Sequence, residues 1–257
     1  MGYEIQRKKS VYAKADRASM LSVLKHAVKN GLYVNTVIDV GAADGTPELY
    51  ESFPSAQHIL LEPLIEFQEA LERYVKQISR VEYIQAAAWS ESGEIMINVH
   101  PDLVGSSIYL ESEGQLVNGK PRSVPAITLD SMVEKKKLGG PFLLKIDTQG
   151  SELDVLKGAK RVLEKTEMIL IESSFFEFFE NGPSFQDCID FMASNGFVVY
   201  DIFGFQYRPL DGALSQVDLA FVRDHSSLRV KHIYATKEQR SALNEILRKQ
   251  AEKRIEV

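Results

Sequence analysis

The chain is organised around the segment Thr36-Val37-Ile38-Asp39-Val40-Gly41-Ala42-Ala43-Asp44-Gly45-Thr46. Its first residues are apolar apart from Asp39 and predict a short buried strand. Gly41 and Gly45 allow a tight turn and let a ligand approach the backbone. Thr46 is a favourable N-cap, and the proline and glutamate that follow it suit the first turn of a helix. A strand, a glycine turn and a helix start in this order predict a nucleotide-type site in an open α/β sheet.

The turn differs from a dinucleotide-binding turn. A dinucleotide site needs the pattern G-x-G-x-x-G, because the pyrophosphate lies on the turn and on the helix N-terminus. Here Ala43 replaces the middle glycine, and Asp44 would place a negative charge near the phosphates. S-adenosylmethionine has a cationic sulfonium and no phosphate, so it tolerates this acid better. An ordinary strand-to-helix connection is the alternative. The residues expected to contact this cofactor are Asp39, Gly41, Ala42, Asp44 and Gly45.

A second predicted strand, residues 58–63, ends in the acid Glu62. In doubly wound sheets an acid about 20 residues beyond the glycine turn binds ribose hydroxyls. Pro63 fixes the backbone immediately after Glu62; a solvated strand-end carboxylate is the alternative reading of this acid. A third strand and a small-residue loop occupy residues 81–89, where Ala86 and Ala87 leave room for an adenine ring. Glu62, Pro63, Ala86 and Ala87 therefore join the predicted cofactor site, as does Asp147 farther along the chain.

A fourth buried strand is predicted at residues 142–146, with Lys145 inside it and Asp147 at its end. Doubly wound order places this strand beside the first one, across the switch point where ligands bind. Asp147 would then face the turn at Gly41 across the same crevice. The alternative is a purely structural ion pair between Lys145 and Asp147. A helix is expected to follow over residues 152–163.

Length and composition predict one large domain more readily than two small ones. The net charge of −6 argues against a surface that coats nucleic acid, and the single cysteine excludes an internal disulfide and an all-cysteine zinc site. Residues 1–16 are charged and lack an apolar core, and no later run approaches the length of a membrane span. We therefore expect a cytoplasmic protein with neither a nucleic-acid partner nor a membrane span.

Four segments of the chain resemble the FkbM family of S-adenosylmethionine-dependent methyltransferases. They are residues 37–42, 61–63, 144–159 and 216–222, and the most specific part is Lys145-Ile146-Asp147. The resemblance implies a Rossmann-like class I methyltransferase fold: a mostly parallel, doubly wound sheet with a reversed last strand. It also implies methylation of hydroxyl groups on sugars, glycans or other small natural products. Gln149 stands where the family usually has Glu. The function of that carboxylate in the family, proton transfer or ion binding, therefore does not carry over directly to this chain.

Methyl transfer to a hydroxyl needs in-line positioning and a deprotonated oxygen. We expect Asp147 to be the base and Lys145 its electrostatic or orienting partner, with Glu152 and Glu172 in reserve. No metal is expected, because one carboxylate beside Gln149 is a poor site for a hard cation. Two other functions stay open: a nicotinamide-dependent oxidoreductase, and a cofactor-binding partner protein without catalysis.

The expected organisation has three parts. Residues 1–34 form an N-terminal helical segment, residues 35–224 the methyltransferase domain, and residues 225–257 a C-terminal helical extension. An exposed insertion around residues 100–125, rich in Gly, Ser, Glu and Lys over residues 111–123, could close over a substrate. The two strands near 197–203 and 217–222 predict an antiparallel hairpin. The last helix, residues 237–254, carries a narrow apolar stripe that suits the body of the chain or a second subunit in a homo-oligomer, and the sequence does not choose between them.

Overall fold

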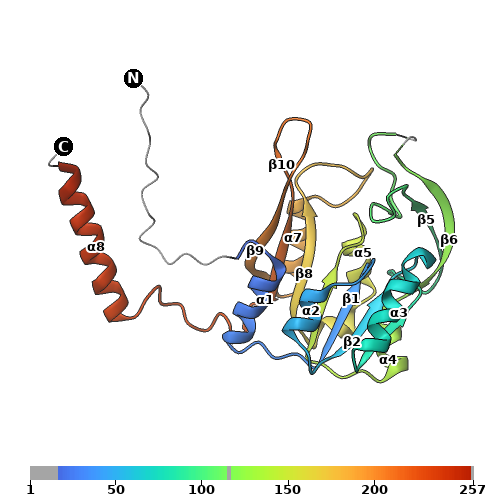
Figure 1. Ribbon diagram of the computed structural model, residues 1–257, viewed down its shortest axis with the longest axis horizontal. Helices are drawn as coiled ribbons and strands as arrows, with labels where there is room; N and C mark the ends of the chain where they lie inside the picture. The colour runs from blue at the N-terminus through green and yellow to red at the C-terminus, as the bar shows by residue number, and fades with distance from the viewer. Residues whose placement is uncertain (1–16, 115–116, 256–257) are drawn as a thin grey trace. The chain divides into compact units, whose positions relative to one another are not determined.

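The computed structural model describes residues 17–114 and 117–255 (Figure 1). Residues 17–228 form one compact unit, and the chain from residue 229 onward belongs to a second unit. Each unit is described by itself. The domain boundaries expected at residues 34 and 224 stay predictions.

The main sheet is a mostly parallel α/β sheet. Within the described residues it has seven strands, in the order β3-β2-β1-β7-β8-β10-β9. Their bounds are β1 Thr36–Val40, β2 Gln57–Leu61, β3 Val81–Ile84, β7 Phe142–Ile146, β8 Thr166–Ser174, β9 Phe197–Tyr207 and β10 Leu214–Arg223. Strand β10 lies between β8 and β9 and runs antiparallel to both, whereas the other pairs are parallel. The predicted doubly wound sheet with a C-terminal antiparallel hairpin is confirmed.

Helices cover both faces of this sheet because successive residues of each buried strand point to opposite faces. Val37 packs with α1 (Met20–Lys29) and α2 (Pro47–Ser52), and α3 (Gln68–Gln77) covers the same face nearer β2 and β3. Ile38 packs in the core on the opposite face. The helices on that face are α4 Leu129–Lys136, α5 Glu152–Lys157, α6 Lys160–Leu163 and α7 Phe185–Ser194. A 3₁₀ turn, η1 Ile65–Phe67, leads into α3.

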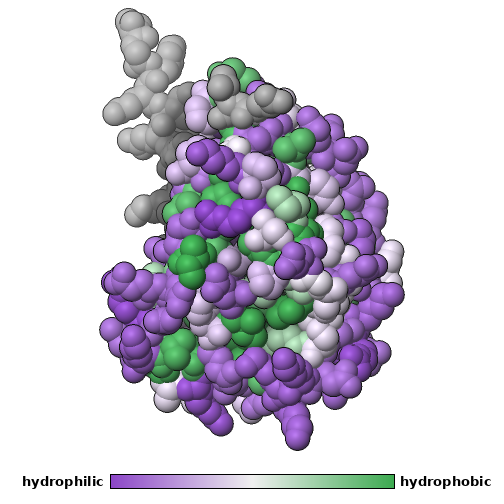
Figure 2. Space-filling view, turned by 90° about the vertical axis from the view of Figure 1, so that its right-hand side faces the viewer, coloured by the Kyte–Doolittle hydropathy of each residue, from purple (hydrophilic) through white to green (hydrophobic). Residues whose placement is uncertain are grey.

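A second, smaller sheet corrects two expectations. It consists of β4 Ala87–Ala88, β6 Lys120–Ile127 and β5 Gly93–Val99, in that order. The expected third strand ends at Ile84, and Ala87 and Ala88, which were expected in a loop, pair with β6 as a short strand. The prediction of an exposed loop over residues 111–123 is wrong at its C-terminal end, because Lys120–Ile127 forms strand β6 and pairs with β5. Figure 1 shows β5 and β6 to the right of the main sheet, and Figure 2 shows hydrophobic patches among mostly hydrophilic residues on that side.

The helix expected over residues 152–163 is broken at Gly158. A Cβ at this glycine would collide with the carbonyl oxygen of Trp89, so the chain can pass this point only without a side chain. The carboxylate of Asp130 then accepts hydrogen bonds from the backbone N–H groups of Arg161 and Val162 at 3.0 and 2.9 Å. These bonds start α6 as a separate short helix.

The second unit contains α8, Lys237–Ile255, which agrees with the helix expected over residues 237–254. Its apolar residues Ile246 and Leu247 are 45% and 37% exposed. In the part of the chain that the structure describes, no helix is long and apolar enough to cross a membrane.

Candidate functional site

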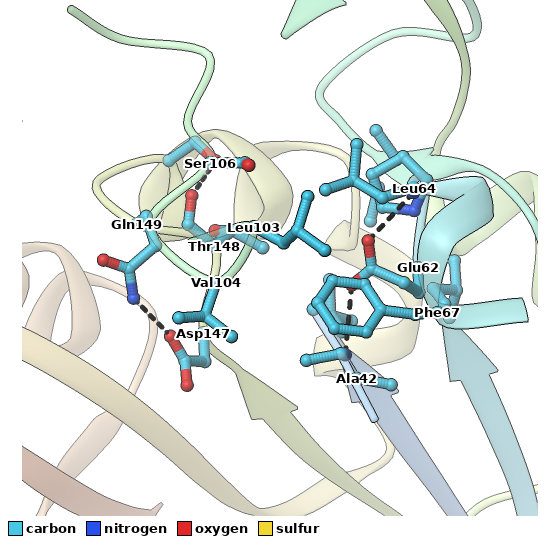
Figure 3. A pocket seen from close by; sticks show the side chains of 18 of the residues that line it. Ala42, Glu62, Leu64, Phe67, Leu103, Val104, Ser106, Asp147, Thr148 and Gln149 are labelled. Atoms are coloured by element: carbon cyan, nitrogen blue, oxygen red, sulfur yellow. Dashed lines mark hydrogen bonds between the residues drawn. The ribbon is translucent and has the colours of Figure 1, made fainter. Parts of the chain in front are cut away.

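A cavity of about 310 Å³ opens at the carboxyl ends of β1, β2 and β7 (Figure 3). Every residue predicted to contact the cofactor lines it except Asp39, and Lys145 and Asp147 line it too. Figure 3 shows Asp147 and Gln149 on one side of this cavity and Glu62 and Phe67 on the other. The cavity therefore brings together residues from segments far apart in the sequence.

Three residues of the glycine turn have positive φ angles. Gly41, Ala43 and Gly45 have φ angles of 71°, 45° and 103°, in the left-handed region that favours glycine. A Cβ on Gly41 would collide with the backbone carbonyl of Asp147, and one on Gly45 would collide with the ring of Tyr74. The side-chain position of each glycine is therefore filled by the protein, while the backbone of both glycines still lines the cavity. Gly41 lets the ends of β1 and β7 approach each other.

Lys145 links the glycine turn to the two acids. Its Nζ donates a hydrogen bond of 2.8 Å to the Gly41 carbonyl and lies 3.4 Å from Asp39 Oδ1 and 3.5 Å from Asp147 Oδ2. Asp39 and Lys145 are opposite each other in the parallel pairing of β1 with β7, which makes this contact a consequence of strand register. Burial alone would lower the pKa of Lys145, but the carboxylates of Asp39 and Asp147 raise it above its ordinary value. Lys145 therefore stays charged.

The two acids on Lys145 differ in exposure. The Asp39 side chain is 1% exposed, and neither of its carboxylate oxygens has a hydrogen-bond partner among the described residues. Burial raises the pKa of Asp39, and the charge of Lys145 opposes this rise. The Asp147 side chain is 38% exposed and lines the cavity. Asp147 is therefore the member of this group that a bound molecule can reach, whereas Asp39 lies beneath the turn.

Glu62 lies across the cavity from Asp147 and is held by the backbone. Its Oε2 accepts a hydrogen bond from Ala43 N at 3.1 Å, and its Oε1 accepts one from Leu64 N at 2.9 Å. The residue is 5% exposed; burial raises its pKa, and the two N–H groups oppose this rise. The carboxylate is thus fixed in orientation at the cavity wall.

Glu152 lies outside the cavity lining, behind the turn that follows β7. Its Oε1 accepts hydrogen bonds from Thr148 N at 2.9 Å and Gly150 N at 3.1 Å. Burial raises the pKa of Glu152 to about 7. The geometry makes Glu152 a support of the turn that carries Asp147.

The N-terminal part of the expected insertion lines the cavity. Leu103, Val104, Ser106 and Ile108 contribute to the lining, whereas none of the described residues in 111–123 does. Ser107 Oγ ties this loop to the body by donating a 2.5 Å hydrogen bond to the Gln149 carbonyl. The sequence contained a signal for this contact, because the apolar pair Leu103-Val104 stands between the polar residues Asp102 and Ser106 of the loop. Other lining residues that sequence reasoning missed are Leu64, Phe67, Ala88 and Ser151.

The lining fits S-adenosylmethionine. Alanines at positions 42, 86, 87 and 88 leave room for a flat adenine ring, and Glu62 at the wall can accept hydrogen bonds from hydroxyl groups. The acidic side chains of Asp44 and Asp147 suit a ligand with a positive charge. No three His, Cys, Asp or Glu side chains in residues 17–114 and 117–255 are placed to hold a metal ion.

Known proteins share both sequence and fold features with this chain. The family profile described as Methyltransferase FkbM domain matches residues 39–199. Hexuronic acid methyltransferase AglP of Haloferax volcanii is 28% identical over 83 residues, and the match spans 32% of each chain, about a third of this curated relative. The magnesium protoporphyrin IX methyltransferase ChlM of Synechocystis PCC 6803, solved with bound S-adenosylmethionine, has a TM-score of 0.44 and 10% identity, with 79% of this chain and 76% of that chain covered. The precorrin-6y C5,15-methyltransferase of Geobacter metallireducens GS-15 has a TM-score of 0.42 and 10% identity, with coverages of 82% and 94%.

Proposed function

Because the chain belongs to the FkbM family of methyltransferases, we propose that it transfers a methyl group from S-adenosylmethionine to a hydroxyl of a sugar, glycan or other small natural product. S-adenosylmethionine is the methyl donor of this family, so the nicotinamide alternative is set aside. One observation carries the proposal: the carboxylate of Asp147 and the glycine turn at Gly41 line the same cavity, with the ammonium of Lys145 between them.

Asp147 is the proposed general base. A base must come within hydrogen-bond reach of the hydroxyl that it deprotonates. Asp147 is exposed enough for this contact, whereas Asp39 and Lys145 are almost completely buried. A base so placed typically contributes ~10²–10⁴-fold to the rate.

Lys145 and Glu152 are proposed as positioning residues. Lys145 holds the Gly41 carbonyl and the Asp147 carboxylate to one ammonium, and this fixes the cofactor turn relative to the base. Glu152 holds the turn after β7 through two backbone N–H groups. Alignment of the reacting groups can contribute ~7–11 kcal/mol to catalysis.

When bound, the cofactor would supply a methyl group carried on a sulfonium. After the transfer, the cofactor would leave as a neutral thioether. The residues of this chain do the rest: Glu62 and the small side chains orient the adenosine, Leu103 and Val104 add apolar contacts at the cavity wall, and Asp147 takes the hydroxyl proton. The acid at Asp147 then returns its proton to solvent.

A sugar-like acceptor is supported by one relative. The curated relative AglP, which matches about a third of its length to this chain, carries the name hexuronic acid methyltransferase.

The test combines cofactor binding with methyl transfer. The protein is incubated with S-adenosylmethionine and a panel of neutral sugars, amino sugars, hexuronic acids and phenols, and products are detected by mass spectrometry. Asp147→Asn is expected to bind S-adenosylhomocysteine as the wild type does and to lose ~10²–10⁴-fold in turnover. Full turnover in this variant would refute the base, and cofactor binding without transfer to any acceptor would favour a non-catalytic partner.

A further inference from the structure

Gln149 holds a backbone conformation that a residue with a side chain rarely adopts. Its φ angle is 53°, in the left-handed region that favours glycine. The turn is held from behind by Glu152 and from the covering loop by Ser107, whose hydroxyl donates to the Gln149 carbonyl. Residues in strained conformations persist when the surrounding structure determines them, and they cluster at functional sites. These contacts fix the backbone from which the Gln149 side chain projects.

The side-chain amide of Gln149 lies between two carboxylates. Its Nε2 is 2.9 Å from Asp147 Oδ1 and 3.4 Å from Glu172 Oε1. An amide nitrogen has two hydrogens and can donate one to each carboxylate. Figure 3 shows this amide pointing at Asp147 from the turn after β7. Without a donor between them, two neighbouring carboxylates repel each other.

The surroundings of Glu172 repeat this arrangement. Gln216 Nε2 donates to Glu172 Oε1 at 2.6 Å, and Gln206 Nε2 donates to Oε2 at 3.0 Å. Burial and then the charge of Asp147 raise the pKa of Glu172 to about 8. Glu172 is thus held by the neutral amide donors of Gln149, Gln206 and Gln216, whereas a site built for a cation would place oxygen ligands there.

From this geometry we infer that Gln149 is a positioning residue whose amide takes the place that a divalent cation would occupy between Asp147 and Glu172. The amide orients the carboxylate of Asp147 and keeps the site free of metal, so methyl transfer proceeds without a divalent ion. The part of this inference that concerns the base rests on the proposed function of Asp147. The part that concerns cation exclusion rests on the contacts of Gln149 alone.

The experiment uses the full chain with S-adenosylhomocysteine and titrates Mn²⁺ by electron paramagnetic resonance. Gln149→Glu replaces the donor by an acceptor of the same shape and brings three carboxylates together, a ligand set that hard cations prefer. We expect Mn²⁺ to bind this variant at least tenfold more tightly than the wild type. The double variant Gln149→Glu/Glu172→Gln is the matched control and should lose most of the gain.

A thermal melt of each variant establishes that it is folded, and Gln149→Leu tests the positioning role. If acceptor turnover is measurable, Gln149→Leu should lower kcat at least tenfold with little change in the affinity for S-adenosylhomocysteine, because the Asp147 carboxylate has lost the donor that orients it. Equal Mn²⁺ affinity in folded wild type and Gln149→Glu would overturn the inference. Retained turnover in Asp147→Asn would overturn the proposed base instead, and the Mn²⁺ result would be unaffected by it.

Discussion

Replacing Lys145 by methionine tests the buried pairing beneath the cofactor turn. The substitution keeps an apolar chain of similar length and removes the ammonium that lies 3.4 Å from Asp39 Oδ1. Asp39 then stays buried, with no hydrogen bond to its carboxylate oxygens among the described residues. Breaking a buried ion pair by removing one partner costs ~3–5 kcal/mol, because the remaining charge is uncompensated.

Protonation of Asp39 sets an upper limit on this cost. At pH 7, protonating a carboxyl whose ordinary pKa is about 3.9 costs ~4 kcal/mol, and at pH 5 it costs ~1.5 kcal/mol. In Lys145→Met the pKa of Asp39 is higher in the folded state than in the unfolded state. The folded state therefore favours the protonated carboxyl, and its free energy of unfolding falls as the pH rises and this carboxyl must ionise. We therefore expect the free energy of unfolding to fall by ~3–4 kcal/mol at pH 7 and by at most ~1.5 kcal/mol at pH 5.

The assay is urea unfolding at both pH values, followed by the fluorescence of Trp89, the single tryptophan of the chain. The matched control is Lys145→Met/Asp39→Asn, which removes both charges and should recover more than half of the loss at pH 7. A cost below ~1 kcal/mol at pH 7, or an equal cost at both pH values, would refute the reasoning that Asp39 is a buried charge held by Lys145.

Two further predictions concern the cofactor wall and the fold. Glu62→Ala should weaken binding of S-adenosylhomocysteine by ~10–150-fold, since hydrogen bonds to charged groups contribute ~1.5–3 kcal/mol; titration calorimetry measures this, and an unchanged dissociation constant would show that Glu62 does not hold the ribose. Gly158→Ala should lower the free energy of unfolding by ~1–3 kcal/mol, because its Cβ would meet the Trp89 carbonyl although its φ of −86° is ordinary. Gly139→Ala, whose Cβ would make only an ordinary contact with Asn35, is the control, and equal stability of the two variants would contradict the steric argument.

Lys145 shows why the site works as one unit. Its ammonium contacts a carbonyl of the cofactor turn, a buried acid of β1 and the exposed acid at the end of β7. A change in any one of these partners therefore alters the other two contacts. Effects of residues that act in this way are not additive, so the variants at Asp39, Lys145 and Asp147 are best measured in combination.

The adjacency of β1 and β7 and the location of the cavity follow from local sequence. The apolar run that contains Asp39, the apolar run before Asp147, and the glycine turn at Gly41 predict two parallel strands that meet at a switch point. That rule needs no knowledge of side-chain packing, because the connection of strands through helices restricts the possible topologies. The pairing of β1 with β7 confirms it.

Contacts between distant residues were decided only by the tertiary structure. The sequence marks Gly41 and Gly158 as places without a side chain, but their neighbours, the carbonyls of Asp147 and Trp89, come from other elements. The loop at Leu103 covers the cavity because β5 and β6 form a separate sheet, which no local pattern predicted.

By itself the sequence determined the α/β fold, the glycine turn after the first strand and the acids on or beside the strands, since these depend on periodicity and on the chirality of strand connections. Only the folded chain decided that Lys145 joins Asp39 to Asp147 and that the amide of Gln149 lies between two carboxylates. Such contacts depend on strand register and on distances of a few ångströms between segments far apart in the chain, and a linear pattern contains neither.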